Sequence, residues 1–245
     1  MASRLAAAGC VAAGDEAAEL VARAPDEGVL EAWLGRREGG EPLAWITGTV
    51  LFCGRPVGVD PGVYVPRPQT EGLARRAASL LPARGRAADL CTGAGAVAVH
   101  LMAAVPGALV AGTDVDESAV RCARRNGVDA VVGDVDGPLA SGGFDLVAAV
   151  PPYVPTGELQ FLPVDVRRYE PPLALDGGGD GLAVVRRVVA GAARLLRPGG
   201  WLLLEVGGSQ DRLVEPWLAS SGFGPGLAWR DDEGDLRGVA ARLDA

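Results

Sequence analysis

The glycine-rich segment at residues 91–95 is the first place where residue types and spacing could do chemistry. It follows Asp89 at the end of a predicted strand and opens a predicted helix. Glycines let the backbone come close to a ligand, and a helix N-terminus offers unpaired N–H groups. Asp114 ends the next predicted strand, where a carboxylate can accept hydrogen bonds from two ribose hydroxyls. The spacing therefore predicts a nucleotide-like ligand.

Two acidic residues distinguish a dinucleotide from a sulfonium cofactor. The glycine pattern alone fits both, because residues 93–98 also match the dinucleotide-binding pattern with alanine in the last place. Asp89 precedes the glycines, where its carboxylate can face a cationic methionine group but would repel a pyrophosphate. Asp134 ends a third predicted strand, where it can accept a hydrogen bond from an adenine amino group. These carboxylates favour S-adenosyl-L-methionine.

A fourth predicted strand, residues 144–150, runs directly into Pro151, Pro152 and Tyr153. Two prolines remove two N–H donors and stiffen the chain, so the carbonyls at the strand end point in fixed directions. Such carbonyls can accept N–H bonds from a substrate amino group beside a methyl donor, and Tyr153 can wall the pocket. A rigid turn without chemistry would have the same sequence.

The elements that must position these segments alternate between strand and helix. The predicted strands are residues 87–90, 108–113, 130–132, 144–150 and 201–206. The predicted helices between them are residues 94–105, 117–126, 182–196 and 211–220. This alternation predicts a mostly parallel sheet with right-handed crossovers, and residues 226–230 and 236–243 add an antiparallel pair at its edge. The predicted class is α/β, Rossmann-like, with seven strands.

The front of the chain has a different pattern. Residues 5–24 are predicted helical with a break near Gly14, and Asp26 is predicted to cap a helix that ends at Arg37. Residues 43–53 and 55–59 are predicted as paired strands around a turn at Gly54. We therefore divide the chain into a helical segment, a β-hairpin linker and a cofactor-binding domain, at residues 1–40, 41–66 and 67–245.

Two connections outside the regular elements are expected to matter for function. Residues 66–68 form a stiff proline loop before a helix that Thr70 is predicted to cap. Residues 151–180 form a connection that is long enough to indicate a role beyond joining two elements.

Composition limits the classes of function. Hydrophobic residues make up 49% and charged residues 22% of 245, typical of a globular protein. No apolar run reaches the roughly 20 residues of a membrane span, and residues 1–12 lack a signal-peptide pattern, so we expect a cytoplasmic protein that binds no membrane. The net charge of −8 disfavours nucleic acid as a partner.

Metal and histidine chemistry are not expected. Cys10, Cys53, Cys91 and Cys122 are scattered and form no paired motif, so we predict free thiols and no metal site. His100 is the only histidine and lies in an apolar helical stretch, where a packing role is expected.

The sequence resembles the HemK-type protein-(glutamine-N5) methyltransferase family along nearly its whole length. The most specific matches are the Pro-Arg-Pro…Thr-Glu segment at residues 66–71 and Ala-Leu-Asp-Gly-Gly at residues 174–178. The other matching segments are residues 41–48, 52–54, 59–65, 89–95, Asp114, Asn126, 151–153, 170–172, 181–182, 198–200 and Glu205.

The resemblance implies a class I methyltransferase that uses S-adenosyl-L-methionine and methylates a glutamine side-chain amide in a protein. The implied cofactor residues are Asp89, Cys91, Thr92, Gly93, Ala94, Gly95, Asp114, Val115, Asp134 and Val135. The implied acceptor-holding residues are Val150, Pro151, Pro152 and Tyr153. The residues expected to line the substrate pocket are Phe52, Pro66, Arg67 and Pro68.

Two features depart from the family. Its strand-end tetrapeptide begins with Asn, whose side-chain carbonyl accepts one amide N–H and orients the nitrogen, whereas this chain has Val150. By analogy with the loss of one polar transition-state contact, the change costs on the order of 10²–10³ in rate. The front end before residue 41 is also shorter than the family's helical recognition domain, which points to a different partner or a smaller substrate.

Four functions therefore stay open at this stage. The first is methylation of a protein glutamine, and the second is N- or O-methylation of a small molecule. The third is methylation of an amino group in nucleic acid, and the fourth is cofactor binding without turnover. In the enzymatic cases we expect direct displacement promoted by positioning, in a monomer or weak dimer.

Overall fold

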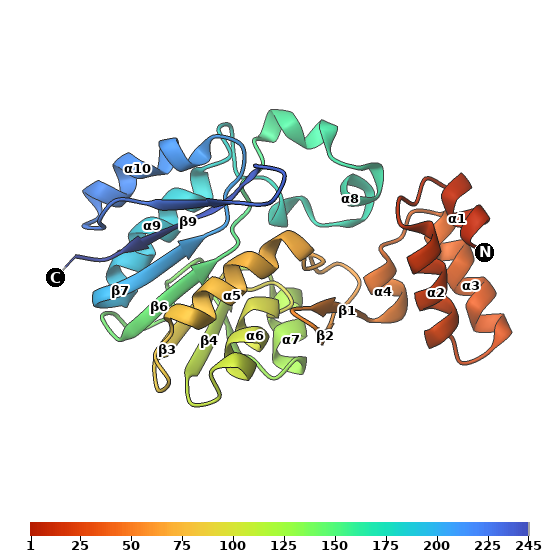
Figure 1. Ribbon diagram of the computed structural model, residues 1–245, viewed down its shortest axis with the longest axis horizontal. Helices are drawn as coiled ribbons and strands as arrows, with labels where there is room; N and C mark the ends of the chain where they lie inside the picture. The colour runs from red at the N-terminus through yellow and green to blue at the C-terminus, as the bar shows by residue number, and fades with distance from the viewer. Residues whose placement is uncertain (245) are drawn as a thin grey trace.

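A seven-stranded sheet forms the centre of the larger part of the molecule (Figure 1), in a computed structural model that describes residues 1–244. Its strand order is β5-β4-β3-β6-β7-β9-β8. The strands are β3 (Arg86–Leu90), β4 (Leu109–Asp114), β5 (Asp129–Val132), β6 (Phe144–Ala149), β7 (Leu196–Leu204), β8 (Leu227–Arg230) and β9 (Leu236–Arg242). Strands β3 to β7 are parallel, and β9 runs antiparallel to both β7 and β8. The predicted α/β class and its antiparallel edge are confirmed.

Helices cover both faces of this sheet (Figure 1). Helices α5 (Glu71–Leu80), α6 (Ala96–Ala104) and α7 (Glu117–Arg125) pack on one face, and α9 (Ala183–Leu195) and α10 (Gln210–Ser220) pack on the other. Each face has its own buried apolar cluster. The strand order reverses between β3 and β6, so the carboxyl ends of these strands border the crevice where such sheets bind ligands.

Three helices at the front form a separate small layer with its own apolar core. They are α1 (Ala2–Ala7), α2 (Ala13–Arg23) and α3 (Glu27–Glu38), which lie apart from the sheet in Figure 1. Their shared core includes Leu5, Leu20 and Leu34. Asp26 caps α3 as predicted, because its carboxylate accepts a hydrogen bond from the Val29 N–H at 2.8 Å. The break predicted near Gly14 lies instead at residues 8–12.

The predicted strand over residues 43–53 is wrong in its first half. Residues Leu43–Thr47 form a short helix, α4, before β1 (Thr49–Phe52) and β2 (Arg55–Gly58) pair around Gly54. Trp45 and its neighbours are buried, and the Trp45 indole N–H donates to the Val63 carbonyl at 2.9 Å. Tertiary packing of this kind overrides the local strand preference of Trp, Ile and Thr.

The long connection at residues 151–180 contains three short elements rather than an irregular loop. These are η2 (Thr156–Phe161), α8 (Val164–Tyr169) and η3 (Pro172–Ala174). None of the three buries a residue fully, so no apolar period marks them in the sequence. A further short turn, η1 (Pro68–Thr70), precedes α5, and Thr70 makes no capping hydrogen bond there, contrary to the prediction.

The helices of residues 1–244 are too short or too polar for any of them to cross a membrane. The boundaries drawn after residues 40 and 66 remain a prediction.

Candidate functional site

A cavity of about 300 Å³ lies at the carboxyl ends of the parallel strands, and we call it the strand-end cavity. Its lining includes eight of the residues predicted from the sequence, namely Cys91, Gly93, Asp114, Val115, Asp134, Val135, Val150 and Pro152. These residues follow β3, β4, β5 and β6, so the parallel sheet brings four distant segments to one edge.

Asp114 connects two sides of the strand-end cavity. One of its oxygens accepts the Gly93 N–H at 2.9 Å, and the other accepts the Asp116 N–H at 3.0 Å. Cys91 and Gly93 have φ values of 57° and 56°, a left-handed conformation that turns the loop toward this carboxylate. A Cβ added at Gly93 would meet no atom within 4 Å, so the space in front of the loop is open. Burial raises the pKa of the Asp114 carboxyl.

Asp89 does not line the cavity, contrary to the expectation that it faces the methionine part of the cofactor. It is 1% exposed, and a single oxygen accepts both the Thr92 hydroxyl at 2.6 Å and the Ala98 N–H at 3.2 Å. Burial raises its pKa to about 7. Asp89 therefore ties the glycine loop to the start of α6.

Three other predicted cofactor residues also lie behind the loop rather than in the cavity, namely Thr92, Ala94 and Gly95. Gly95 has a φ of 83°, and a Cβ there would come within 2.8 Å of the Val128 side chain. Thr92 packs under Gly112, where an added Cβ would lie 3.0 Å from its hydroxyl. These residues shape the loop. Its sharp turn requires backbone conformations that glycine adopts readily, and the close neighbours leave no space for a larger side chain.

Asp134 lines the cavity next to an arginine that no sequence motif marks. Its carboxylate pairs with Arg187 of α9, which also lines the cavity. Val135 has a φ of 54°, and its carbonyl accepts the Thr113 hydroxyl at 2.5 Å. A non-glycine residue in this conformation is uncommon, and here it turns the chain after β5 toward the cavity.

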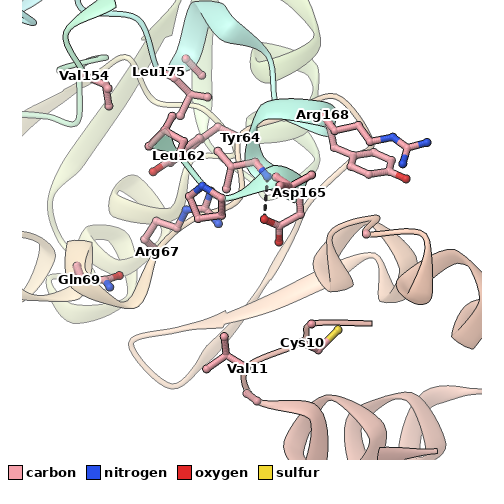
Figure 2. A pocket seen from close by; sticks show the side chains of 18 of the residues that line it. Cys10, Val11, Tyr64, Arg67, Gln69, Val154, Leu162, Asp165, Arg168 and Leu175 are labelled. Atoms are coloured by element: carbon pink, nitrogen blue, oxygen red, sulfur yellow. Dashed lines mark hydrogen bonds between the residues drawn. The ribbon is translucent and has the colours of Figure 1, made fainter. Parts of the chain in front are cut away.

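A wider cleft of about 910 Å³ separates the front helices from the sheet-bearing part of the molecule (Figure 2). Figure 2 shows Cys10 and Val11 on one side of this wide cleft and Leu162 and Asp165 on the other. Residues 8–12 and 37–40 form the first side, and residues 162–169 the second. All three tyrosines of the chain line it, namely Tyr64, Tyr153 and Tyr169.

Tyr169 joins the two sides of the wide cleft at its base. Its hydroxyl donates to the Gly39 carbonyl at 2.9 Å, and its ring packs edge-on against Trp45 at 6.1 Å. The spacing between the front helices and α8 is therefore set by contacts between segments 130 residues apart.

The two cavities meet at three residues, because Tyr64, Val150 and Ala174 line both. Val150 thus lies where a methyl donor in one cavity would reach an acceptor in the other. The Arg67 guanidinium stacks over the Tyr64 ring at 4.9 Å and pairs with the buried carboxylate of Glu170. Burial raises the pKa of the Tyr64 hydroxyl.

Tyr153 is held from two sides. Its hydroxyl donates to Glu205 Oε1 at 3.1 Å, and its carbonyl accepts the side-chain N–H of Gln210 at 2.9 Å. Glu205 follows β7, and its N–H donates to the Ala149 carbonyl at 3.0 Å, so the ends of β6 and β7 lie side by side. Tyr153, Pro151 and Glu205 all line the wide cleft.

Of the four residues expected to line the substrate pocket, only Arg67 does so. Phe52 is 1% exposed and packs in the core beneath the hairpin, and Pro66 is buried as well. Pro68 is exposed at the start of η1 and points into neither cavity. An aromatic residue in a strand is more often a core residue than a pocket wall, and Phe52 follows that rule.

Comparison with known proteins supports a methyltransferase. The Methyltransferase small domain family model matches residues 61–162. A release factor glutamine methyltransferase of Cereibacter sphaeroides is 36% identical over 99% of this chain and 95% of its own length. A 4-amino-L-phenylalanine/4-methylamino-L-phenylalanine methyltransferase of Streptomyces pristinaespiralis is 42% identical over 78% of this chain and 69% of its own length.

Solved structures agree on the fold. A T. thermophilus 16S rRNA N2 G1207 methyltransferase has a TM-score of 0.55 and 21% identity, covering 80% of this chain and 44% of that one. The match to the Cereibacter relative includes the front helices, so the shorter front end is no ground by itself for a different partner. With this identity over nearly both full lengths, the chain belongs to the release factor glutamine methyltransferase family and is an S-adenosylmethionine-dependent methyltransferase.

Proposed function

We propose that the chain transfers a methyl group to the side-chain amide nitrogen of a glutamine in a protein. The observation that carries this proposal is the meeting of the two cavities at Val150 and Tyr64. The wide cleft is open and bordered by three separate segments, which suits a loop of a protein acceptor better than an enclosed pocket would. The names of relatives such as the Cereibacter enzyme support the same acceptor.

The strand-end cavity fits S-adenosylmethionine. Asp114 has a partly buried carboxylate next to open space, where it would hold the ribose hydroxyls, and the backbone at Cys91 and Gly93 would approach the methionine part. Asp134 and Arg187 would border the adenine. When bound, the cofactor supplies an electrophilic methyl group on sulfur.

The chain's own residues would hold the acceptor nitrogen. The Val150 and Pro151 carbonyls lie at the fixed end of β6, where they can accept N–H bonds. Tyr153 is fixed by Glu205 and Gln210, so it can wall the site without moving. Rate enhancement then comes mainly from orientation of the nitrogen toward the methyl group.

A second candidate is methylation of an amino group on a small molecule. Val150 favours it, because an amine is a stronger nucleophile than an amide and needs less help from an acceptor at this position. The Streptomyces pristinaespiralis relative, whose name describes an amino acid substrate, is a second observation in its favour.

One labelling experiment tests both candidates. Cell extract is incubated with the enzyme and isotopically labelled S-adenosylmethionine, and proteins and small molecules are both analysed by mass spectrometry. Label on a glutamine residue is the expected result. Label confined to a small amine would support the second candidate instead, and an extract without any labelled nitrogen would contradict both.

A further inference from the structure

Glu205 is a buried carboxylate at the edge of the acceptor site. The proposed function uses it only as the partner that holds Tyr153. It is 4% exposed and lines the wide cleft together with Val150. Its Oε1 accepts the Tyr153 hydroxyl. Its Oε2 is buried and has no hydrogen-bond partner among residues 1–244. A buried carboxylate oxygen without a partner is costly, so the fold retains this arrangement at a cost in stability.

The nearby cations are already engaged with other carboxylates. Arg237 of β9 faces Glu205 from one side but pairs with Asp231 at 2.5 Å. Arg67 faces it from another side but pairs with Glu170. Neither guanidinium makes a hydrogen bond to Glu205, so its buried second oxygen is left without a cationic partner.

Two polar neighbours complete the surroundings of Glu205. The Thr70 hydroxyl lies beside the carboxylate and opposes the rise of its pKa, yet the two groups fall outside hydrogen-bond geometry and the hydroxyl is itself unpaired. The Tyr64 hydroxyl lies in the same region and is kept neutral by burial. Burial has the largest effect and raises the pKa of Glu205.

We propose that Glu205 Oε2 accepts the N–H of the methyl acceptor, in the role that Val150 cannot fill. The adjacent ends of β6 and β7 place the Glu205 residue in the wall of the wide cleft that Val150 also lines. This inference rests on the proposed function only in requiring a nitrogen acceptor, whether amide or amine.

The chemistry of the step is balanced within this arrangement. The nitrogen lone pair forms the new C–N bond, and the S–C electron pair remains on sulfur, which becomes neutral. The nitrogen then releases one proton, which Glu205 Oε2 receives. The raised pKa of Glu205 helps it to hold that proton. A carboxylate here also repels phenolate and carboxylate acceptors, so anionic acceptors are disfavoured.

The test compares Glu205→Gln with the wild type on the acceptor that the labelling experiment identifies. We expect kcat to fall about 10²-fold, as for loss of a general base, with unchanged calorimetric affinity for S-adenosylmethionine. Glu71→Gln is the control, because Glu71 accepts the Cys53 N–H at 2.8 Å away from both cavities and its replacement can still accept. The control should keep wild-type kcat.

Two further measurements separate a chemical role from a structural one. Glu205→Asp should retain more kcat than Glu205→Gln, because a carboxylate can still receive the proton, whereas an amide can accept the N–H but cannot take its proton. In the wild type, kcat at saturating donor and acceptor should fall as pH drops through a pKa above 4.5, the ordinary value for glutamate. This profile carries the test if Glu205→Gln does not fold.

The outcomes distinguish the inference from the proposed function. Wild-type kcat in Glu205→Gln, or an equal loss of kcat in Glu205→Gln and Glu205→Asp, would overturn the inference. So would a wild-type profile without an acid limb. Methylation of a small amine by the wild type, with the expected Glu205→Gln effect, would overturn the proposed glutamine substrate and leave the inference standing.

Discussion

The strand-end cavity and the wide cleft are built in different ways. The strand-end cavity is formed by turns that directly follow parallel strands, and its key carboxylate, Asp114, is fixed by backbone N–H groups. The wide cleft is formed by three segments far apart in the sequence, which meet through contacts such as Tyr169 with Gly39. The strand-end cavity suits a ligand that is the same in all family members. The wide cleft suits an acceptor that differs between them.

The largest expected effect comes from breaking the strand-end cavity alone. Asp114→Ala removes a charge-assisted acceptor for the ribose, worth about 1.5–3 kcal/mol, so the Kd for S-adenosylmethionine should rise on the order of 10²-fold. Calorimetry on the variant measures this directly. Because Asp114 also accepts two backbone N–H groups, thermal unfolding is recorded as a control. An unchanged Kd would remove Asp114 from the cofactor site.

The second prediction concerns Asp89 in the glycine loop and the pH dependence of the protein's stability. Burial raises the pKa of Asp89 from 3.8 to about 7, so between these values the folded protein holds a proton that the unfolded chain releases. The free energy of unfolding should therefore fall as pH rises through this window, by up to about 1.4 kcal/mol per pH unit.

Asp89→Asn should remove most of this pH dependence. Both donors, the Thr92 hydroxyl and the Ala98 N–H, reach the same oxygen, so an amide carbonyl can accept both. Denaturant unfolding at pH 5 and pH 8 measures the difference for both proteins. If the free energy of unfolding changed equally with pH in the wild type and the variant, Asp89 would be ionised in the folded protein across this pH range. Asp114 and Glu205 have pKa values shifted in the same direction, so some pH dependence remains in the variant.

The contrast between the two cavities also explains what could be predicted from the sequence. Asp114 and the glycines follow strands with a clear hydrophobic pattern, so their meeting point follows from the order of the parallel strands. The prediction for Asp89 has the correct loop but the wrong side of it. A carboxylate before a glycine turn can point into the cavity or back into the fold, and only the packing of Thr92 and Ala98 decides between them.

The wide cleft could not be predicted because it depends on tertiary contacts. Residues 162–169 and the break at residues 8–12 have no apolar period, so nothing local marks them as walls of one site. Glu205 offers a usable signal, since it directly follows a buried parallel strand at the edge where ligands bind. For Phe52 the sequence does contain the right signal, because its hydrophobic neighbours indicate a core position. The prediction that it lines the substrate pocket is therefore wrong for a reason visible in the sequence.

The third prediction concerns Val150, at the junction of the two cavities. On a glutamine peptide, Val150→Asn should raise kcat about tenfold, because it adds an acceptor for the second amide N–H, and such a contact is worth about 1–1.5 kcal/mol. If the natural acceptor is instead a small amine, the same change should lower activity, since it leaves an unpaired amide in an apolar position. Steady-state assays on both acceptors decide between them, and no change on either would place residue 150 away from the reacting nitrogen.

The smallest expected effect tests the wide cleft alone. Val11 is fully exposed on its front-helix side, in the break between α1 and α2 (Figure 2). A protein acceptor in the cleft would bury part of this side chain, worth about 1 kcal/mol, so Val11→Asp should raise KM for a protein acceptor about fivefold. It should leave the Kd for S-adenosylmethionine and the KM for a short glutamine peptide unchanged. Leu109→Asp is the matched control, because Leu109 is also exposed but lies at the opposite end of β4 and lines neither cavity. If both variants alter the protein KM equally, the effect is one of overall charge, and the acceptor does not reach the front helices.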